Sequence, residues 1–305
     1  MLCYFEDSIV ADMEKELKFH PITIADRDRV QNYLDKLGIV SSGMQFSTML
    51  LWGFDGRTQI AEKDDVLYIV TRQQNCYRMI APLTEKLGEY AEILSFAEKN
   101  DPHELCDKIF YGVTKELKPA FESAGYAVSE CRDYDDYVYS VQDLTELSGK
   151  AYHGKRNHIN AFLESNSFEY VAVTPSMEDE CMRVFDAWLD TKDEEDADER
   201  RATKIALENM EALGLLGGGI RVNGILKAFS LGQKINGDTA LIHIEKAVDE
   251  RGLFPLINRE FLSHAFADML YVNREEDMGS EGLRKAKLSY KPLRFEPSYT
   301  ARKMS

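Results

Sequence analysis

The stretch GGGIRVNGILKAFSLGQKINGDTALIHIEKA, residues 217–247, predicts three consecutive β-strands. Its apolar residues form short runs that are separated by two Asn-Gly pairs, at 223–224 and 236–237. Asn-Gly is typical of a two-residue hairpin turn, because both turn positions need a positive φ. We therefore expect three antiparallel strands, followed by a helix around 256–267 and a short strand at MLYVN, residues 269–273.

The order strand, helix and hairpin occurs twice, near residue 20 and again near residue 168. In the first copy the helix begins near Asp26 and ends at Gly38, and TQIAEKDDVLYIVTR then reads as two strands. In the second copy FEYVAVTPSMEDECMRVFDAWLD precedes the strands described above. We expect a duplicated mixed α/β chain, with one domain in residues 1–142 and the other in 143–305.

Two stretches between the first hairpin and the second copy read as helices. They are TEKLGEYAEILSFAEKN, residues 84–100, and DPHELCDKIFYGVTKELKPAFESAG, residues 101–125. The second is expected to end at Gly125, a common C-cap residue. The region before residue 143 is therefore predicted to alternate between strands and helices.

Composition indicates a globular cytoplasmic protein. Of its 305 residues 44% are hydrophobic and 30% are charged, and the formal net charge is -16. Such an acidic chain is unsuited to coating DNA or other nucleic acid without specificity. Its five cysteines are scattered without a C-x-x-C pair, as expected of reduced thiols in the cytoplasm. We expect neither a signal peptide nor an integral membrane segment.

Two stretches depart from this acidity. Residues 282–295 contain no acid, and their cations are Arg284, Lys285, Lys287, Lys291 and Arg294. Residues 147–163 also contain no acid and include Lys150, Lys155 and Arg156. Each stretch is open to two interpretations, a solvated surface or part of a shared anion-binding surface. In the second case Arg156 should lie close to the helix that carries Arg284, Lys285 and Lys287.

The strand ALIHIEKA places two ionisable side chains, His243 and Glu245, on one face. They are either a satisfied buried pair or a pair that transfers protons. The three glycines at 217–219 are not followed by a helix in phosphate-loop register, and close strand packing explains them better. His153 and His158 are poorly spaced for a metal. We find no nucleophilic triad and expect neither a metal nor a cofactor.

Several stretches together resemble one family, the soluble bacterial relatives of the C-terminal domain of phosphatidylglycerol lysyltransferase. The resemblance rests on FSTMLLWG (46–53), GKRNHINAF (154–162), GILKAFSLG (224–232), IHIEKA (242–247), GLFPLINREF (252–261) and NREEDMGSEGLRKAKLSYKP (273–292). These relatives have two fused GNAT-like acyl-CoA N-acyltransferase domains and are related to the Fem aminoacyltransferases. The resemblance therefore implies transfer of an amino acid from aminoacyl-tRNA to an amine or hydroxyl, with a small molecule or a lipid headgroup as acceptor.

Within the matching stretches, we expect Glu245 or Asp277 to act as the base and Lys285 or Lys287 to stabilise the oxyanion. The residues expected to bind substrate are Lys155, Arg156, Asn157, His243, Arg274, Glu275, Gly279, Arg284 and Tyr290. The pyrophosphate loop of acetyl-CoA-dependent enzymes is missing after Glu245, so coenzyme A is not the expected donor. Two alternatives stay open: a non-catalytic protein that binds an anion or lipid headgroup, and a coenzyme A-dependent N-acyltransferase with a degenerate loop.

Overall fold

The fold is that of a computed structural model, which describes residues 17–73, 76–100, 105–191 and 197–304. Contacts divide the chain into two compact units. Unit 1 contains Met1–Ile39, Trp52–Cys131 and Ser298–Ser305, and unit 2 contains Val40–Leu51 and Arg132–Pro297. Each unit therefore includes a segment from the opposite end of the sequence.

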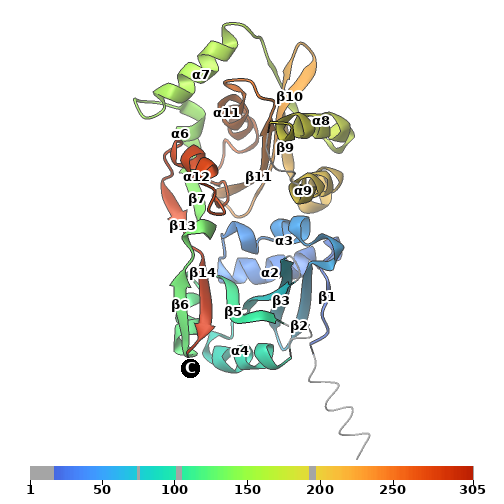
Figure 1. Cartoon of the computed structure of the whole chain (residues 1–305), viewed down its shortest axis with the longest axis vertical. Helices are drawn as coiled ribbons and strands as arrows, with labels where there is room; N and C mark the ends of the chain where they lie inside the picture. Colours follow the sequence, from blue (N-terminus) through green and yellow to red (C-terminus); the bar gives the residue numbers. More distant parts are fainter. Residues whose placement is uncertain (1–16, 74–75, 101–104, 192–196, 305) are drawn as a thin grey trace, which may run out of the picture. The chain divides into compact units, whose positions relative to one another are not determined.

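Unit 1 is built on a seven-stranded sheet with the strand order β1-β2-β3-β4-β5-β14-β6. Its strands are β1 (His20–Pro21), β2 (Thr58–Lys63), β3 (Val66–Gln73), β4 (Cys76–Leu83), β5 (Leu105–Val113), β6 (Tyr126–Glu130) and β14 (Tyr299–Lys303). Its α-helices are α2 (Arg27–Leu37), α4 (Tyr90–Lys99) and α5 (Lys118–Ser123). Helices α2 and α4 lie on opposite faces of the sheet (Figure 1).

Unit 2 is built on a second seven-stranded sheet, with the order β13-β7-β12-β11-β10-β9-β8. Its strands are β7 (Asp136–Ser140), β8 (Glu169–Ala172), β9 (Leu216–Val222), β10 (Ile225–Lys234), β11 (Thr239–Ala247), β12 (Tyr271–Asn273) and β13 (Arg294–Glu296). Its helices are α6 (Val141–Glu146), α7 (His153–Leu163), α8 (Glu178–Leu189), α9 (Ala197–Glu208), α10 (Met210–Leu213), α11 (Leu253–Ala265) and α12 (Glu281–Leu288). Helix α3 (Phe46–Trp52) belongs to it except for its last residue.

Short 3-10 helices complete the description of both units. They span Ile24–Asp26, Ser42–Met44, Phe54–Gly56, Leu87–Glu89, Arg132–Tyr134 and Pro175–Met177.

The two sheets have the same pairing pattern. In unit 1, strands β1 to β4 are antiparallel neighbours and β4 pairs in parallel with β5. In unit 2, β8 to β11 are antiparallel neighbours and β11 pairs in parallel with β12. The next position in each sheet is filled by a strand from the other half of the sequence, β14 in unit 1 and β7 in unit 2. The predicted tandem of two mixed α/β sheets is therefore confirmed.

This exchange bears on the predicted domain boundary. A cut between residues 142 and 143 separates β7 from the sheet of unit 2 and β14 from the sheet of unit 1. The boundary after residue 142 stays a prediction about independently folding halves. The two compact units have the residue ranges given at the start of this subsection.

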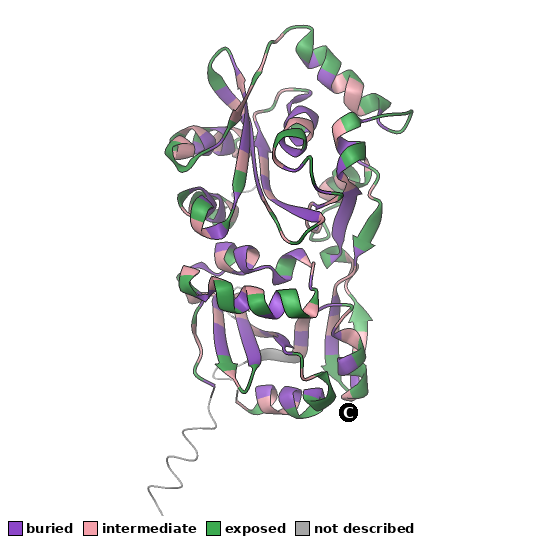
Figure 2. Cartoon of the chain, turned by 180° about the vertical axis from the view of Figure 1, so that it is seen from behind, coloured by how far each residue is buried: buried purple, intermediate pink, exposed green. Residues whose placement is uncertain are grey.

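Several local predictions from both halves of the sequence agree with the structure. Strands β9 and β10 are joined at Asn223 and Gly224, whose φ values of 50° and 79° are those of a tight hairpin turn. Helix α2 ends at Gly38, which adopts the left-handed conformation. Alternate residues of β11 face opposite sides of the sheet, since Glu245 contacts α11 and Lys246 contacts α8 and α9. Figure 1 shows α11 on one face and α8 and α9 on the other, and Figure 2 shows the buried residues that line these faces.

One prediction of secondary structure is wrong. Of the expected helix at 101–125, residues 101–104 lie outside the described residues, 105–113 form strand β5, and 118–123 form the short helix α5. Strand β5 gains partners on both edges, β4 on one side and β14 on the other. Because β14 lies nearly two hundred residues away in the sequence, the local pattern carried no signal for this pairing.

Candidate functional site

The candidate site lies where β12 separates from β11 in unit 2. The parallel pairing of these strands ends at Leu241 and Asn273, although β11 continues to Ala247. The chain after β12 instead stays with β7, because Arg274 N donates to Tyr137 O and Tyr137 N donates to Glu275 O. Charged and polar side chains from β11 and the segment after β12 therefore face each other.

Glu245 on β11 holds the centre of the first cluster. Its Oε1 accepts a 2.8 Å hydrogen bond from Nη2 of Arg274, and its Oε2 accepts a 3.0 Å bond from Nδ2 of Asn258 on α11. The side chains of Glu245 and Arg274 are only 10% and 13% exposed. This is a shielded, charge-assisted contact, which is stronger than the exposed ion pairs of a protein surface.

Lys155 and Tyr290 complete this cluster. The ammonium of Lys155 on α7 lies 3.6 Å from the centroid of the Tyr290 ring, and the guanidinium of Arg274 lies 4.7 Å from the same centroid. Burial, together with the nearby charge of Arg274, lowers the pKa of Lys155 to about 8. Burial raises the pKa of the Tyr290 phenol above its ordinary range. Lys155 is thus a lysine that is able to exchange a proton near neutral pH.

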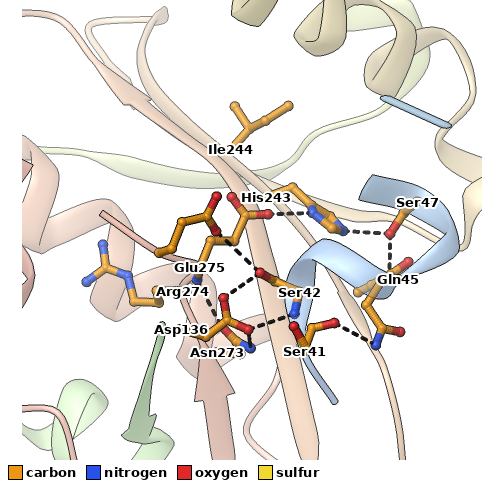
Figure 3. Close-up of polar contacts among 12 residues, drawn as sticks. Ser41, Ser42, Gln45, Ser47, Asp136, His243, Ile244, Asn273, Arg274 and Glu275 are labelled. Carbon is orange, nitrogen blue, oxygen red and sulfur yellow. Dashed lines mark hydrogen bonds and ion pairs between the residues drawn. The ribbon is translucent and has the colours of Figure 1, made fainter. Parts of the chain in front are cut away.

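A second cluster is built around His243 on β11 (Figure 3). His243 Nδ1 lies 3.0 Å from Oε1 of Glu275, and His243 Nε2 lies 3.0 Å from Oγ of Ser47. The Ser47 hydroxyl oxygen also accepts a hydrogen bond of 2.8 Å from Gln233. The side chain of His243 is 2% exposed, and Ser47 is also buried. His243 and Glu245 therefore do not pair with each other, and each binds a residue of the segment after β12.

Strand β12 is also bound through a buried carboxylate, Asp136. Its oxygens accept hydrogen bonds from the backbone N–H and the hydroxyl of Ser42 and from Nδ2 of Asn273. Burial raises the pKa of Asp136 to about 6 although these bonds act in the opposite direction. Figure 3 shows this cluster beside that of His243. Segment 40–51 and β12 are thus joined through Asp136.

Asp277 lies in a set of contacts that hold helix α12. Arg284 binds both of its oxygens at 2.8 Å, and the backbone N–H of Gly279 and the Tyr137 hydroxyl donate to it at 2.9 and 2.5 Å. The hydrogen bonds from Arg284 lower the pKa of Asp277 well below its usual range. A carboxylate so stabilised in its charged form is a weak base, and this favours a role in positioning α12.

The two lysines of α12 differ in their surroundings. The ammonium of Lys287 donates hydrogen bonds of 2.5 Å to the carbonyl oxygens of Arg274 and Glu276, and burial lowers its pKa. It thereby fixes the backbone that presents Arg274. Lys285 is exposed.

The two basic stretches adjoin through Lys155 and Tyr290, and the Tyr152 hydroxyl also donates to Tyr290 O at 3.1 Å. Arg156 is directed elsewhere, because its Nη1 donates to the carbonyl oxygens of Leu147 and Gly149. Asn157 is exposed on α7 and contacts His153. The structure thus brings together Lys155, His243, Glu245, Arg274, Glu275 and Tyr290 and leaves Arg156 and Asn157 outside their contacts.

The sequence analysis did not identify several polar residues of these clusters, among them Ser42, Ser47, Asp136 and Asn258. Ser42, Ser47 and Asp136 lie far in sequence from the residues they bind, and only the fold joins them. Asn258 lies 13 residues from Glu245, on the helix that follows its strand. Asn258 carries the one local signal, since an amide within the apolar run of GLFPLINREF is unusual on a buried helix face.

Among residues 17–73, 76–100, 105–191 and 197–304, no group of three or more His, Cys, Asp or Glu side chains is placed to hold a metal ion. Across the same ranges, every helix is too short or too polar to span a membrane. Cys181 is a buried cysteine whose thiol is not in a disulfide.

The fold and its paired sheets define a tandem GNAT-like protein, and solved structures share this architecture. The structure of FemX matches with a TM-score of 0.55 at 8% identity, and the match covers 94% of this chain and 96% of the FemX chain. The structure of L-PGS from Bacillus licheniformis matches with a TM-score of 0.64 at 17% identity, and the match covers 92% of each chain. The predicted GNAT-like fold is therefore confirmed.

The chain belongs to the family described as phosphatidylglycerol lysyltransferase, C-terminal, whose profile matches residues 35–302. A conserved protein of unknown function from Bacteroides thetaiotaomicron VPI-5482 is 35% identical, and its structure matches with a TM-score of 0.82. That match covers 93% of this chain and 99% of the other. The comparison with curated proteins finds no relative. The protein is thus related to acyl- and aminoacyltransferases.

Proposed function

We propose that the protein transfers an amino acid from aminoacyl-tRNA to an amine or hydroxyl acceptor. The observation that carries the proposal is the cluster of Glu245, Arg274, Lys155 and Tyr290 at the separation of β11 and β12. It combines a shielded permanent cation with a lysine whose pKa is about 8. Acyl transfer from an ester needs these two functions, stabilisation of an oxyanion and removal of a proton.

The reaction assigns one role to each residue. The acceptor nitrogen or oxygen attacks the ester carbonyl, and neutral Lys155 takes the proton that the acceptor loses. The Arg274 guanidinium stabilises the negative charge that develops on the carbonyl oxygen. The ester C–O bond then breaks, and the terminal ribose hydroxyl of the tRNA leaves with a proton from Lys155. The products are an amide or ester of the acceptor and uncharged tRNA.

For Glu245, which was expected to act as the base, the contacts favour a positioning role. Both of its oxygens already accept hydrogen bonds, from Arg274 and Asn258. A carboxylate in this state orients its donors, so we propose Glu245 as the residue that positions Arg274. Lys287 supports the same arrangement by binding the Arg274 carbonyl.

The turn before α11 is a poor fit for the pyrophosphate of coenzyme A. Asp249, Glu250 and Arg251 precede Gly252, and the N–H of Leu253 already binds the Glu250 carbonyl. The space beside Gly252 is filled by His158 and Phe162 of α7, because a Cβ there would lie 2.4 Å from His158 O. A pyrophosphate would find little room at this helix terminus, and one of the N–H groups that would bind it is already used. This supports a donor other than acetyl-CoA.

The proposal is tested by following a labelled amino acid from a panel of charged tRNAs in the presence of purified protein and cell extract. Transfer of the label to a new amide or ester supports it. Binding of an anionic metabolite without transfer would favour a binding protein, and consumption of acetyl-CoA would favour a coenzyme A-dependent enzyme. Arg274→Met should slow transfer by about 100-fold or more, whereas Lys285→Met, on the exposed face of α12, is the matched control.

A further inference from the structure

The hydroxyl group of Ser42 lies between two carboxyl groups. Its Oγ is 2.6 Å from Oδ1 of Asp136 and 3.5 Å from Oε2 of Glu276. The backbone N–H of Ser42 also donates to Asp136, at 2.7 Å. Ser42 belongs to segment 40–51, Asp136 begins β7, and Glu276 follows β12. One hydroxyl group thus joins three separate parts of unit 2.

These three groups need one proton more than the ionised carboxylates leave them. A serine hydroxyl has a single hydrogen, and an ionised carboxylate can only accept. If Ser42 donates to Asp136, its contact with Glu276 is a hydrogen bond only when Glu276 is protonated and donates to Oγ. If Ser42 donates to Glu276 instead, Asp136 must carry the proton. Both contacts are therefore satisfied only when one carboxyl group is neutral.

A third acid increases the negative charge beside this pair. Glu275 precedes Glu276 in the chain and binds His243 on β11, with 3.0 Å between Oε1 and Nδ1. Burial, together with the charges of Glu275 and Asp136, raises the pKa of Glu276 to about 7, and burial raises the pKa of Asp136 to about 6. Shielded carboxylates that lie close together repel each other, so the pair keeps a proton at a pH where exposed carboxyl groups have lost theirs.

Lys287 on α12 offsets only part of this charge. It acts to lower the pKa of Glu276, but its ammonium donates to the carbonyl oxygens of Arg274 and Glu276. The guanidinium of Arg274, the cation within the same segment, is bound to Glu245. Lys287 thus holds the backbone after β12, while the carboxyl group of Glu276 is in contact with Ser42.

The backbone beside Glu276 is held in an unusual conformation. Glu275 has a φ of 59°, in the left-handed region that a non-glycine residue occupies only when its surroundings fix it. Its N–H donates to Oδ1 of Asn273 at 2.8 Å, and its carbonyl oxygen accepts from the N–H of Tyr137 at 3.1 Å. The contact between Glu276 and Ser42 is one of those that fix this turn, and its loss lets the turn relax.

We propose that Asp136, Ser42 and Glu276 form a proton-dependent clamp between segment 40–51 and the segment after β12. While the two carboxyl groups share one proton, both contacts of the Ser42 hydroxyl are hydrogen bonds and the clamp is closed. When this proton is lost, the contact with Glu276 becomes a repulsion between oxygens, and both segments open more often. Arg274 lies in the segment that is released, so its position depends on pH.

Hydrogen exchange measured by mass spectrometry on the full-length protein tests the clamp without any transfer reaction. Peptides that cover 40–51 and 273–277 are compared at about pH 6 and about pH 8.5, after division by the intrinsic exchange rate at each pH. Their protection should fall by about 10-fold toward the higher pH, since a carboxyl group with a raised pKa stabilises the closed form only while it is protonated. Protection that is equal at both pH values, or that falls to the same extent in α2 (Arg27–Leu37), would overturn the inference.

Three variants separate the proton from general effects on folding. Glu276→Gln is neutral at every pH and its amide can donate to Ser42, so both peptides should stay protected at high pH. Glu276→Met is also neutral but cannot donate, and it should exchange about 10-fold faster than Glu276→Gln at both pH values. Glu281→Gln, at an exposed acid of α12, is the matched control and should keep the pH dependence of the wild type.

The variants also give results that would contradict the clamp. A wild-type pH dependence in Glu276→Gln, or its loss in Glu281→Gln, would overturn the inference. If Glu276→Gln fails to fold, Glu276→Met decides, because a pH dependence that persists without a titratable group at this position cannot come from Glu276.

Discussion

Nη2 of Arg274 donates a 2.8 Å hydrogen bond to Oε1 of Glu245, across the gap that opens where β12 separates from β11. Glu245 lies on β11 and Arg274 directly follows β12, and the pairing of these two strands ends at Leu241 and Asn273. Four further contacts maintain this arrangement, from Asn258 to Glu245, from Lys287 to the Arg274 carbonyl, and from Lys155 and Arg274 to Tyr290. The site is therefore held by the fold and not by the loop alone.

Asp136 should make the stability of the protein depend on pH in the acidic range. Burial raises its pKa from 3.8 to about 6, so the folded protein binds a proton that the unfolded chain releases between these values. The free energy of unfolding therefore falls as pH rises from about 4 to about 6, by on the order of 3 kcal/mol from this group.

Denaturant unfolding of wild type and Asp136→Asn at several pH values measures this contribution. In the variant the group no longer titrates, so the difference between the two proteins should change across this range and stay constant above about pH 7. A difference that is the same at pH 4 and pH 7 would show that Asp136 titrates normally.

Gly252 should be one of the least replaceable residues of unit 2. Its φ is +101°, and an added Cβ would lie 2.4 Å from the His158 carbonyl oxygen of α7, which also carries Lys155. Gly252→Ala should therefore destabilise the protein by more than about 2 kcal/mol and weaken ligand binding. Gly224→Ala is the control, since its φ is also positive but nothing lies within 4 Å of the added Cβ. Thermal unfolding compares them, and equal losses would show that the contact with α7 is unimportant.

The exchanged strands predict how the chain behaves when it is divided. A fragment of residues 1–142 lacks β14, which pairs with both β5 and β6, and a fragment of residues 143–305 lacks β7, which pairs with β12 and β13. Each fragment alone should expose unpaired strand edges and aggregate or stay unfolded.

Co-expression of the two fragments should instead give a soluble complex with the circular dichroism of the intact protein. Two separately folded, monomeric fragments would contradict this and would support a simple domain boundary at residue 142.

Much of the fold could be predicted from sequence because its signals are local. The Asn-Gly turn at 223–224 requires two positive φ values, and the helix ending at Gly38 carries its own stop signal. The strand at 105–113 was predicted as a helix because its pairing depends on β14, and nothing nearby in the sequence indicates that partner.

The site was predictable in part for a related reason. Lys155 and Arg156 are neighbours on one helix and point about 100° apart, so the composition of the stretch could not decide which of them faces Tyr290. Asn258 on α11 contributes to the site through its hydrogen bond to Glu245, which lies on the preceding strand β11. Such roles depend on packing directions that a single sequence does not specify.

The most direct test of the account is the rate at which charged tRNA loses its amino acid to an acceptor. Wild-type protein and the variants Arg274→Met and Lys285→Met are each mixed with labelled aminoacyl-tRNA, and both the ester on the tRNA and the new product are followed in time. We expect the wild type and Lys285→Met to transfer the label at similar rates and Arg274→Met to be slower by about 100-fold or more, as when an oxyanion donor is lost. Equal rates for Arg274→Met and the wild type, or a label that stays on the tRNA while acetyl-CoA is consumed, would contradict the account.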